Sequence, residues 1–351
     1  MGPMIPPSEP PVFAPEAALS APRASSSVLD FQEAAALAER LDAEVGRVII
    51  GQRQARREVL LCLLAGGHGL LRGVPGLAKT LLIRTLADAV SLRFGRIQFT
   101  PDLMPSDIVG TEVIEEDPAT GRRSVRFIPG PIFANIILAD EINRTPPRTQ
   151  AALLEAMQEF QVTVGGVRHE LERPLFVLAT ENPIEQEGTH PLPEAQLDRF
   201  MMNIVMDYPA LDDERRILAE TTSVEAPTVS PVASGAELEA ARALVRALPA
   251  ASNVVDYALR LVRATRPGDP SAPPDARRWI EWGAGPRAGQ SLLLGAKARA
   301  LLEGRKVPAP DDVTAVALPV LRHRVLLNFH AQAEGVTPDR VIEHLLDAVR
   351  P

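Results

Sequence analysis

Eight consecutive residues combine two glycines, a proline, a lysine and a threonine just ahead of an amphipathic stretch. They are Gly73, Val74, Pro75, Gly76, Leu77, Ala78, Lys79 and Thr80. A loop of this kind between a strand and a helix surrounds a phosphate with backbone N–H donors, and the helix N-terminus adds positive partial charge. In this pattern Lys79 reaches the β- and γ-phosphates of a nucleotide, and the Thr80 hydroxyl is a ligand of Mg²⁺. The loop therefore predicts ATP and Mg²⁺ as cofactors.

One position of this loop departs from the usual pattern. Ala78 stands where a second glycine is common. Because alanine tolerates a helix-opening conformation, we expect the replacement to change the loop little. The alternative for the whole run is a glycine turn that carries a surface lysine.

Sixty residues further along, an apolar run ends in two adjacent carboxylates. Residues 136–139 are apolar, and Asp140 and Glu141 follow them. A buried strand that ends in carboxylates is costly unless a cation meets them. We expect Asp140 to hold Mg²⁺ through water and Glu141 to polarise the attacking water. Alone, the pattern is also a common strand end, but together with Lys79 it predicts nucleotide hydrolysis.

A further polar segment follows the next apolar run, residues 175–179. It includes Asn182, which precedes Pro183. An amide at the carboxyl end of a neighbouring strand can orient water against the γ-phosphate. Asn182 is equally well explained as a turn residue before proline.

Short apolar runs and helical patterns alternate between about residues 66 and 209. The runs occupy residues 69–71, 96–99, 135–139, 175–179 and 202–206. This alternation indicates a parallel sheet with helices on both faces. After about residue 210 the strand-like runs stop, and helical patterns separated by proline-rich breaks predict a second, all-helical domain.

Length, charge and composition narrow the classes of protein. The chain has 351 residues, which favours two domains, and its net charge of −8 argues against non-specific binding to nucleic acid. Residues 1–27 are rich in proline and predict a disordered segment. No apolar stretch approaches the roughly 18 residues needed to span a bilayer, and no secretory signal is evident. We expect a cytoplasmic protein without membrane insertion.

Taken together, these motifs resemble an AAA+ ATPase of the MoxR family. The similarity covers roughly residues 30–350, and the motifs at 73–80, 140–144, 182, 197–200 and 285–288 occur in the family's order. It implies an α/β P-loop core with a parallel five-stranded sheet of order 5-1-4-3-2 and a C-terminal all-helical lid. We accordingly assign residues 28–209 to the core and residues 210–351 to the lid. The resemblance also implies a homo-oligomeric ring, usually a hexamer, with nucleotide between subunits.

The resemblance gives roles to single residues of the nucleotide site. These are Lys79 and Thr80 in the Walker A motif, Asp140 and Glu141 in the Walker B motif, Asn182 as sensor 1, and Gly51 in the segment 48–52 that borders the adenine.

Two arginines complete the implied site. Arg199 resembles the finger that a subunit offers to its neighbour's nucleotide, and Arg287 corresponds to sensor 2, the lid arginine that senses the γ-phosphate. The alternative for Arg199 is a surface salt bridge with Asp198 or Glu194. The alternative for Arg287 is a surface charge at a helix start.

Two inserted segments, residues 111–127 and 161–171, have the alternating pattern and turns of hairpins. In related AAA+ proteins such hairpins face the ring pore or a partner, whereas the bare sequence predicts only surface hairpins.

The leading interpretation is a ring-forming ATPase that remodels or matures client proteins. Resemblance to MoxR suggests clients with a von Willebrand factor A domain, matured or loaded with metal. One alternative is a motor subunit like that of magnesium chelatase. Another is a nucleic-acid motor or loader, which the net charge argues against, so we expect no nucleic-acid partner. A nucleotide-binding scaffold without turnover is disfavoured because Glu141 and Arg199 are both present.

Overall fold

A parallel sheet of five strands forms the centre of the protein. The computed structural model describes residues 29–116, 118, 121–184, 188–222 and 228–351, so the segment expected to be disordered lies outside the described residues. The central strands are β1 (Gly69–Gly73), β2 (Phe94–Gln98), β5 (Ile136–Asp140), β8 (Phe176–Glu181) and β9 (Met202–Met206). They pair in the order β2-β5-β8-β1-β9 and are all parallel. Counted along the chain, this is the expected order 5-1-4-3-2, which is confirmed.

Helices cover both faces of this sheet. Those of the first 200 residues are α1 (Phe31–Val48), α2 (Arg53–Ala65), α3 (Lys79–Ala89), α4 (Pro105–Val109), α5 (Pro147–Glu159) and α6 (Glu194–Leu197), with short 3₁₀ turns at Pro131–Phe133 and Ile142–Arg144. Because successive strand residues point to opposite faces, alternate side chains enter two separate cores. Leu71 and Leu138 pack with α1, α2 and α3, whereas Leu70, Ile137 and Val177 pack with α4 and α5.

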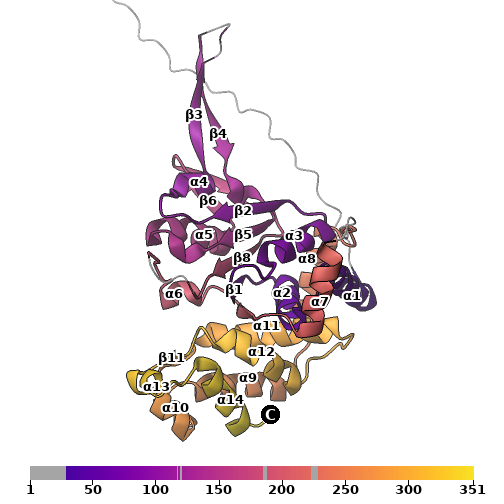
Figure 1. Cartoon of the computed structure of the whole chain (residues 1–351), viewed down its shortest axis with the longest axis vertical. Coiled ribbons are helices and arrows are strands. Elements are labelled where there is room, and N and C mark those ends of the chain that lie inside the picture. Colours follow the sequence, from indigo (N-terminus) through magenta and orange to yellow (C-terminus); the bar gives the residue numbers. More distant parts are fainter. Residues whose placement is uncertain (1–28, 117, 119–120, 185–187, 223–227) are drawn as a thin grey trace, which may run out of the picture.

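Two antiparallel hairpins leave this core. The first joins β3 (Gly110–Glu116) to β4 (Arg123–Pro129), and the second joins β6 (Gln161–Val164) to β7 (Val167–Glu170). The β3–β4 hairpin projects far from the body of the molecule (Figure 1). At its base, the rings of Phe127 and His169 stack with their centroids 4.0 Å apart, which ties the two hairpins together.

The remainder of the chain is mainly helical. Its helices are α7 (Leu211–Thr221), α8 (Gly235–Ala247), α9 (Ser252–Ala264), α10 (Pro274–Trp279), α11 (Pro286–Leu302), α12 (Pro310–Leu321), α13 (Phe329–Ala333) and α14 (Pro338–Ala348). A short antiparallel ladder of β10 (Ile280–Trp282) and β11 (Leu326–Leu327) is added to them, which the expected all-helical domain did not include. No helix in the described ranges is long and apolar enough to cross a membrane.

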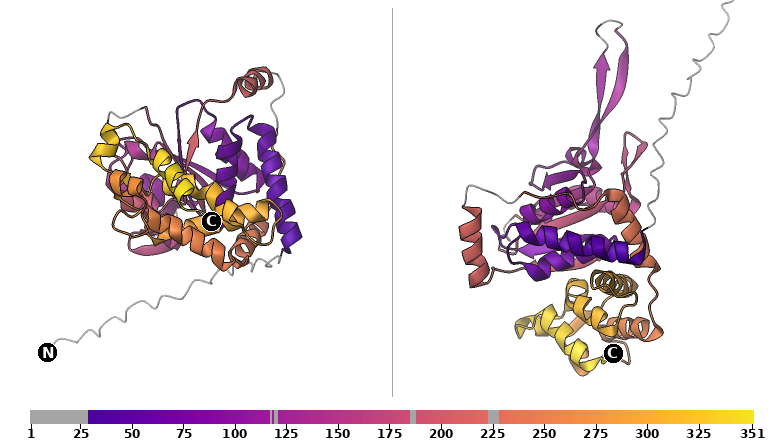
Figure 2. Two further views of the ribbon diagram at one scale, coloured as in Figure 1. Left: turned by 90° about the horizontal axis from the view of Figure 1, so that it is seen from below. Right: turned by 90° about the vertical axis from the view of Figure 1, so that its right-hand side faces the viewer.

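The helices from α9 onward lie below the sheet, at the end opposite the β3–β4 hairpin (Figure 2). Helix α8, in contrast, packs against α1 and α2 as well as against α11. The predicted domain boundary near residue 210 therefore precedes a helix that also contacts the core.

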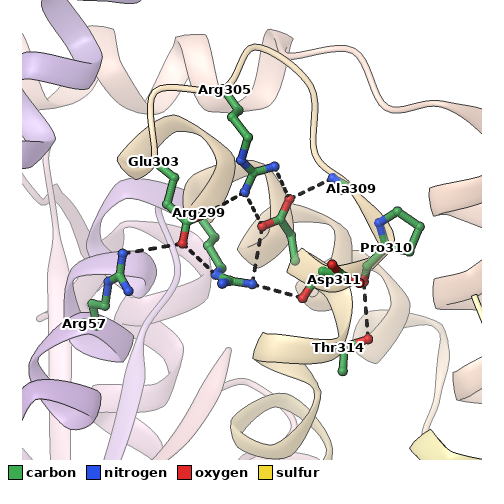
Figure 3. Close-up of polar contacts among 9 residues, drawn as sticks. Arg57, Arg299, Glu303, Arg305, Ala309, Pro310, Asp311 and Thr314 are labelled. Carbon is green, nitrogen blue, oxygen red and sulfur yellow. Dashed lines mark hydrogen bonds and ion pairs between the residues drawn. The ribbon is translucent and has the colours of Figure 1, made fainter.

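An ionic cluster helps to attach α11 to the core (Figure 3). Arg57 of α2 lies 3.5 Å from the carboxylate of Glu303, which follows α11. Arg299 and Arg305 both bind Asp312, whose side chain is only 1% exposed and also accepts a hydrogen bond from the backbone of the α12 N-cap residue. A buried carboxylate needs such partners, since an unpaired charge in the interior is strongly destabilising.

Candidate functional site

The loop of residues 73–80 connects β1 to α3 and has two positions that require glycine. A Cβ atom at Gly73 would lie 2.9 Å from the carbonyl oxygen of Met206 on β9, so no side chain fits there. Gly76 has a φ of +87°, which disfavours other residues. The ammonium of Lys79 donates a hydrogen bond to the carbonyl of Gly73 at 2.8 Å. The loop thus has the close, inward-folded backbone of a phosphate-binding loop.

The conformation of Ala78 differs from the expected one. We expected a helix-opening conformation, but Ala78 has φ 61° and ψ 26°, in the left-handed region. An alanine in this region is disfavoured by about 1–2 kcal/mol because its Cβ crowds the following carbonyl. The loop therefore keeps the backbone of a glycine at this position, with an alanine side chain attached to it.

Replacing Ala78 with glycine is expected to stabilise the fold. Glycine removes the steric penalty of about 1–2 kcal/mol in the folded state. It also raises the conformational entropy of the unfolded chain, which lowers the free energy of unfolding by about 0.4–1 kcal/mol. The net gain lies between zero and about 1.6 kcal/mol, measurable as a higher melting temperature. Ala151→Gly, on the exposed face of α5, is the matched control and should lose about 1 kcal/mol. Equal destabilisation by both changes would contradict the left-handed assignment.

Asp140 and Glu141 are held by a threonine of the neighbouring strand. The Thr180 hydroxyl donates to Oδ1 of Asp140 at 2.7 Å and accepts from the backbone N–H of Glu141 at 2.9 Å. Thr180 is completely buried, and the β5–β8 register, which pairs Ala139 with Ala179, brings it beside Asp140. The other oxygen of Asp140 accepts from Arg96 of β2 at 2.7 Å. The sequence pattern does not single out Thr180 or Arg96.

The side chain of Glu141 is fixed from two sides. Its Oε2 accepts from the amide of Gln98 and from the guanidinium of Arg144, both at 3.0 Å. Glu141 itself has φ 57° and ψ 48°, in the left-handed region, where non-glycine residues are uncommon. A strained backbone and a held carboxylate in one residue are typical of a functional position.

The phosphate-binding loop and the two carboxylates line one cavity of about 470 Å³. Asn182 also lines it, and its buried Nδ2 has no hydrogen-bond partner among the described residues, while its Oδ1 accepts from the N–H of Ile184 at 3.2 Å. A buried amide donor left without an acceptor is rare in proteins. This donor fits a phosphate oxygen or a water beside it. The lining of this cavity therefore fits the phosphates of a nucleotide, with the cation of Lys79 and the carboxylates of Asp140 and Glu141 around it.

A second cavity, of about 300 Å³, adjoins the first along residues 75–78. Its walls include Val48, Ile49, Ile50 and Gln52, which belong to the segment expected to border the adenine. Gly51 does not line the cavity; its φ of +70° places a turn there, close to the Asp213 side chain.

The opposite wall of this cavity comes from residues that the sequence pattern does not single out. They are Tyr208, Pro209 and, on α7, Glu214, Ile217, Leu218 and Thr221. Helix α7 has no buried residue, and Leu218 is 64% exposed, so its apolar side chains are available to a flat ligand. An apolar cleft beside a phosphate loop fits a purine base.

Arg199 and Arg287 lie away from these cavities. Strand β9 starts level with the start of β1, since Met202 pairs with Gly69, so Arg199 is at the opposite edge of the sheet from the phosphate loop. The intervening five residues span about 16 Å. Arg199 is half-buried and donates to the carbonyl of Leu154 at 2.8 Å. Arg287 contacts Asp198, with its Nη1 3.4 Å from Oδ2.

Arg199 forms no ion pair in the described part of the chain, so the alternative of a salt bridge with Asp198 or Glu194 does not describe this structure. The carboxylate of Asp198 instead binds Arg287 and, at 2.7 Å, Arg324. The structure thus divides the expected site into a nucleotide cavity and a separate arginine cluster, at opposite edges of one sheet.

Comparison with known proteins agrees with the fold of the core and of the helical part. Residues 68–202 match the family described as "ATPase family associated with various cellular activities (AAA)", and residues 275–345 match the AAA lid domain. A crystal structure from Cytophaga hutchinsonii, described as a candidate ATPase, superposes with a TM-score of 0.84 at 40% identity, covering 91% of this chain and 96% of that one.

Two curated relatives are similar over most of their lengths. Chaperone MoxR1 of Mycobacterium tuberculosis is 42% identical over 89% of this chain and 81% of its own length. Protein MoxR of Paracoccus denitrificans is 35% identical over 85% of this chain and 91% of its own length. The fold, the cavity at Lys79 and the helical lid are consistent with these relatives. The chain belongs to the MoxR family of AAA+ ATPases.

Proposed function

We propose that this ATPase binds ATP with Mg²⁺ in the cavity at Lys79, hydrolyses it between neighbouring copies of the chain, and uses the cycle to remodel client proteins in the cytoplasm. The observation that supports it best is the separation of the catalytic residues. The cavity contains Glu141 but not Arg199, which lies at the other edge of the sheet. A site of this kind is completed by a second copy.

Within one chain, each residue of the cavity has a distinct task. Lys79 balances phosphate charge, and Mg²⁺, when bound by Thr80 and Asp140, withdraws charge from the phosphate oxygens. Glu141, held in place by Gln98 and Arg144, accepts a proton from the attacking water. The Nδ2 of Asn182, which has no partner among the described residues, orients that water or a phosphate oxygen.

The positions of the nucleotide cavity and of the arginine cluster favour a ring. Helix α6, which leads to Arg199, lies on the left of the molecule in Figure 1. Helix α7, which lines the second cavity proposed for the purine base, lies on the right. A head-to-tail contact then places Arg199 and Arg287 of one copy at the cavity of the next. Repetition of such a contact forms a ring when the rotation between copies closes. By family resemblance, the ring is a hexamer.

The proposed clients carry a von Willebrand factor A domain, and metal insertion is one form of their maturation. The resemblance to MoxR suggests this class, and one relative is named a chaperone. The β3–β4 hairpin offers a contact surface: Ile114 and Val125 pair across its strands and are 72% and 64% exposed. Exposed apolar pairs on a projecting hairpin suit contact with another protein.

Client capture with a hydrolysis-deficient chain tests this proposal. Glu141→Gln should retain proteins with a von Willebrand factor A domain when ATP is present, because the nucleotide-bound state persists. Lys79→Ala should retain none, and a double change of Ile114 and Val125 to serine in the Glu141→Gln chain should reduce the capture. Direct binding of the purified client then confirms the contact. Capture that is independent of ATP, or enrichment of nucleic acid instead, would contradict the proposed client class.

A further inference from the structure

Arg324 is a buried arginine in the turn that follows the lid helix α12. Its side chain is 2% exposed, yet it lies among the residues that connect the lid to the core. Nε donates to Oδ1 of Asp198 at 2.7 Å, and Nη2 donates to the carbonyls of Asp198 and Phe200 at 3.1 and 2.7 Å. Nη1 donates to the carbonyls of Met201 at 3.1 Å and Val320 at 2.5 Å. An arginine has five N–H donors, and this one uses all of them.

These bonds fix the backbone on both sides of Arg199. Arg324 holds the carbonyl of Asp198, which precedes Arg199, and that of Phe200, which follows it. His323 adds a hydrogen bond of 3.1 Å to the carbonyl of Phe200. The segment that carries Arg199 is therefore attached to the lid of its own chain through consecutive lid residues.

Asp198 also connects this segment to the second arginine of the cluster. One carboxylate oxygen accepts from Arg324, and the other lies 3.4 Å from Arg287 at the start of α11. The carboxylate thus sets the spacing between Arg287 and the backbone of Arg199. A charged acceptor shared by two guanidinium groups is a stronger and more directional link than neutral hydrogen bonds.

We infer that Arg324, acting through Asp198, is a positioning residue that holds Arg199 of the core and Arg287 of the lid in one preset arrangement. The inference rests on the proposed function, in which this unit completes the nucleotide site of the neighbouring copy. Movement of the lid in one subunit then moves the arginines that the next subunit uses. Lysine does not replace Arg324, because a lysine ammonium has three donors instead of a planar fork of five.

Arg324→Met tests the inference in homogeneous and mixed rings. Loss of the preset geometry should lower the ATPase rate by about 10²-fold, the effect of a displacement near 1 Å, and Arg324→Lys should recover little of it. The defect should act on the neighbour: mixing Arg324→Met with Glu141→Gln subunits restores partial activity, because some interfaces combine an intact Glu141 with a positioned Arg199.

Hydrogen exchange supplies a readout that does not depend on turnover. Arg324→Met should speed exchange at the amides of residues 199–201, while the peptide of residues 73–80 and the affinity for ATP stay within about twofold of the unchanged chain. Arg322→Met is the matched control. Arg322 lies in the same run but binds the carbonyl of Asn203 and the carboxylate of Asp339, so its loss should leave exchange at residues 199–201 unchanged.

The mixing experiment separates the possible failures. If Glu141→Gln restores Arg199→Ala but not Arg324→Met, Arg324 acts on its own cavity and the inference is wrong. If neither mixture recovers activity in rings that assemble, the proposal of a site shared between copies is wrong, and the inference about Arg324 is wrong too. Should Arg324→Met fail to assemble, Asp198→Asn keeps the carbonyl contacts of the loop and is tested in the same mixtures, with the same readings.

Discussion

Arg199→Ala is expected to lower the ATPase rate by about 10³–10⁵-fold, the usual contribution of an arginine finger. Affinity for ATP should change little, because Arg199 lies at the other edge of the sheet from the cavity of its own chain. Arg199 donates only to the carbonyl of Leu154 in the described contacts, so the loss of its side chain leaves no buried charge unpaired.

A mixture with Glu141→Gln subunits distinguishes a shared site from a local one. Each variant alone lacks an interface with both residues intact, whereas a mixed ring contains some. ATPase rates measured across mixing ratios should therefore rise and then fall. A flat, inactive profile in rings whose assembly is demonstrated would remove Arg199 from the proposed site.

Glu141→Gln is expected to keep nucleotide binding and to lose turnover by about 10²–10⁴-fold, the value of a positioned general base. Glutamine keeps the shape and an oxygen acceptor for Gln98 and Arg144, but it is not a base. Lys79→Ala should instead lose binding, since it removes the positive charge aimed at the phosphates. Equilibrium binding of a fluorescent ATP analogue and steady-state hydrolysis measure the two effects separately. Equal loss of binding in both variants would contradict these roles.

The sequence predicts those parts of the site that depend on local order along the chain. Asp140 and Glu141 follow directly after the apolar run 136–139. Asn182 and the loop that leads to Lys79 come shortly after the runs 175–179 and 69–71, and the carboxyl ends of parallel strands meet at one edge. The sheet order came from family resemblance and is confirmed by the strand pairing.

Other contacts depend on register and burial, which no local pattern encodes. Thr180 meets Asp140 because β5 and β8 pair in one particular register. Arg324 follows directly after Arg322 and His323, and its partner Asp198 is 126 residues away in the chain. The guanidinium is nevertheless buried, at 2% exposure. The left-handed Ala78 is set by closure of the loop between β1 and α3, which overrides the residue's own preference.

In the proposed ring, strand β9 connects the two interfaces of one subunit. At one end it begins just after Arg199, and at the other the carbonyl of Met206 touches Gly73 at the base of the phosphate loop. Two residues further on, Tyr208 lines the second cavity, which fits a purine base. One strand thus links the segment of Arg199, which contacts one neighbour in the proposed ring, to the nucleotide cavity, which receives the arginines of the other neighbour. Cooperativity between neighbouring nucleotide sites then requires no long series of side-chain rearrangements, because a displacement of β9 changes both interfaces of the subunit.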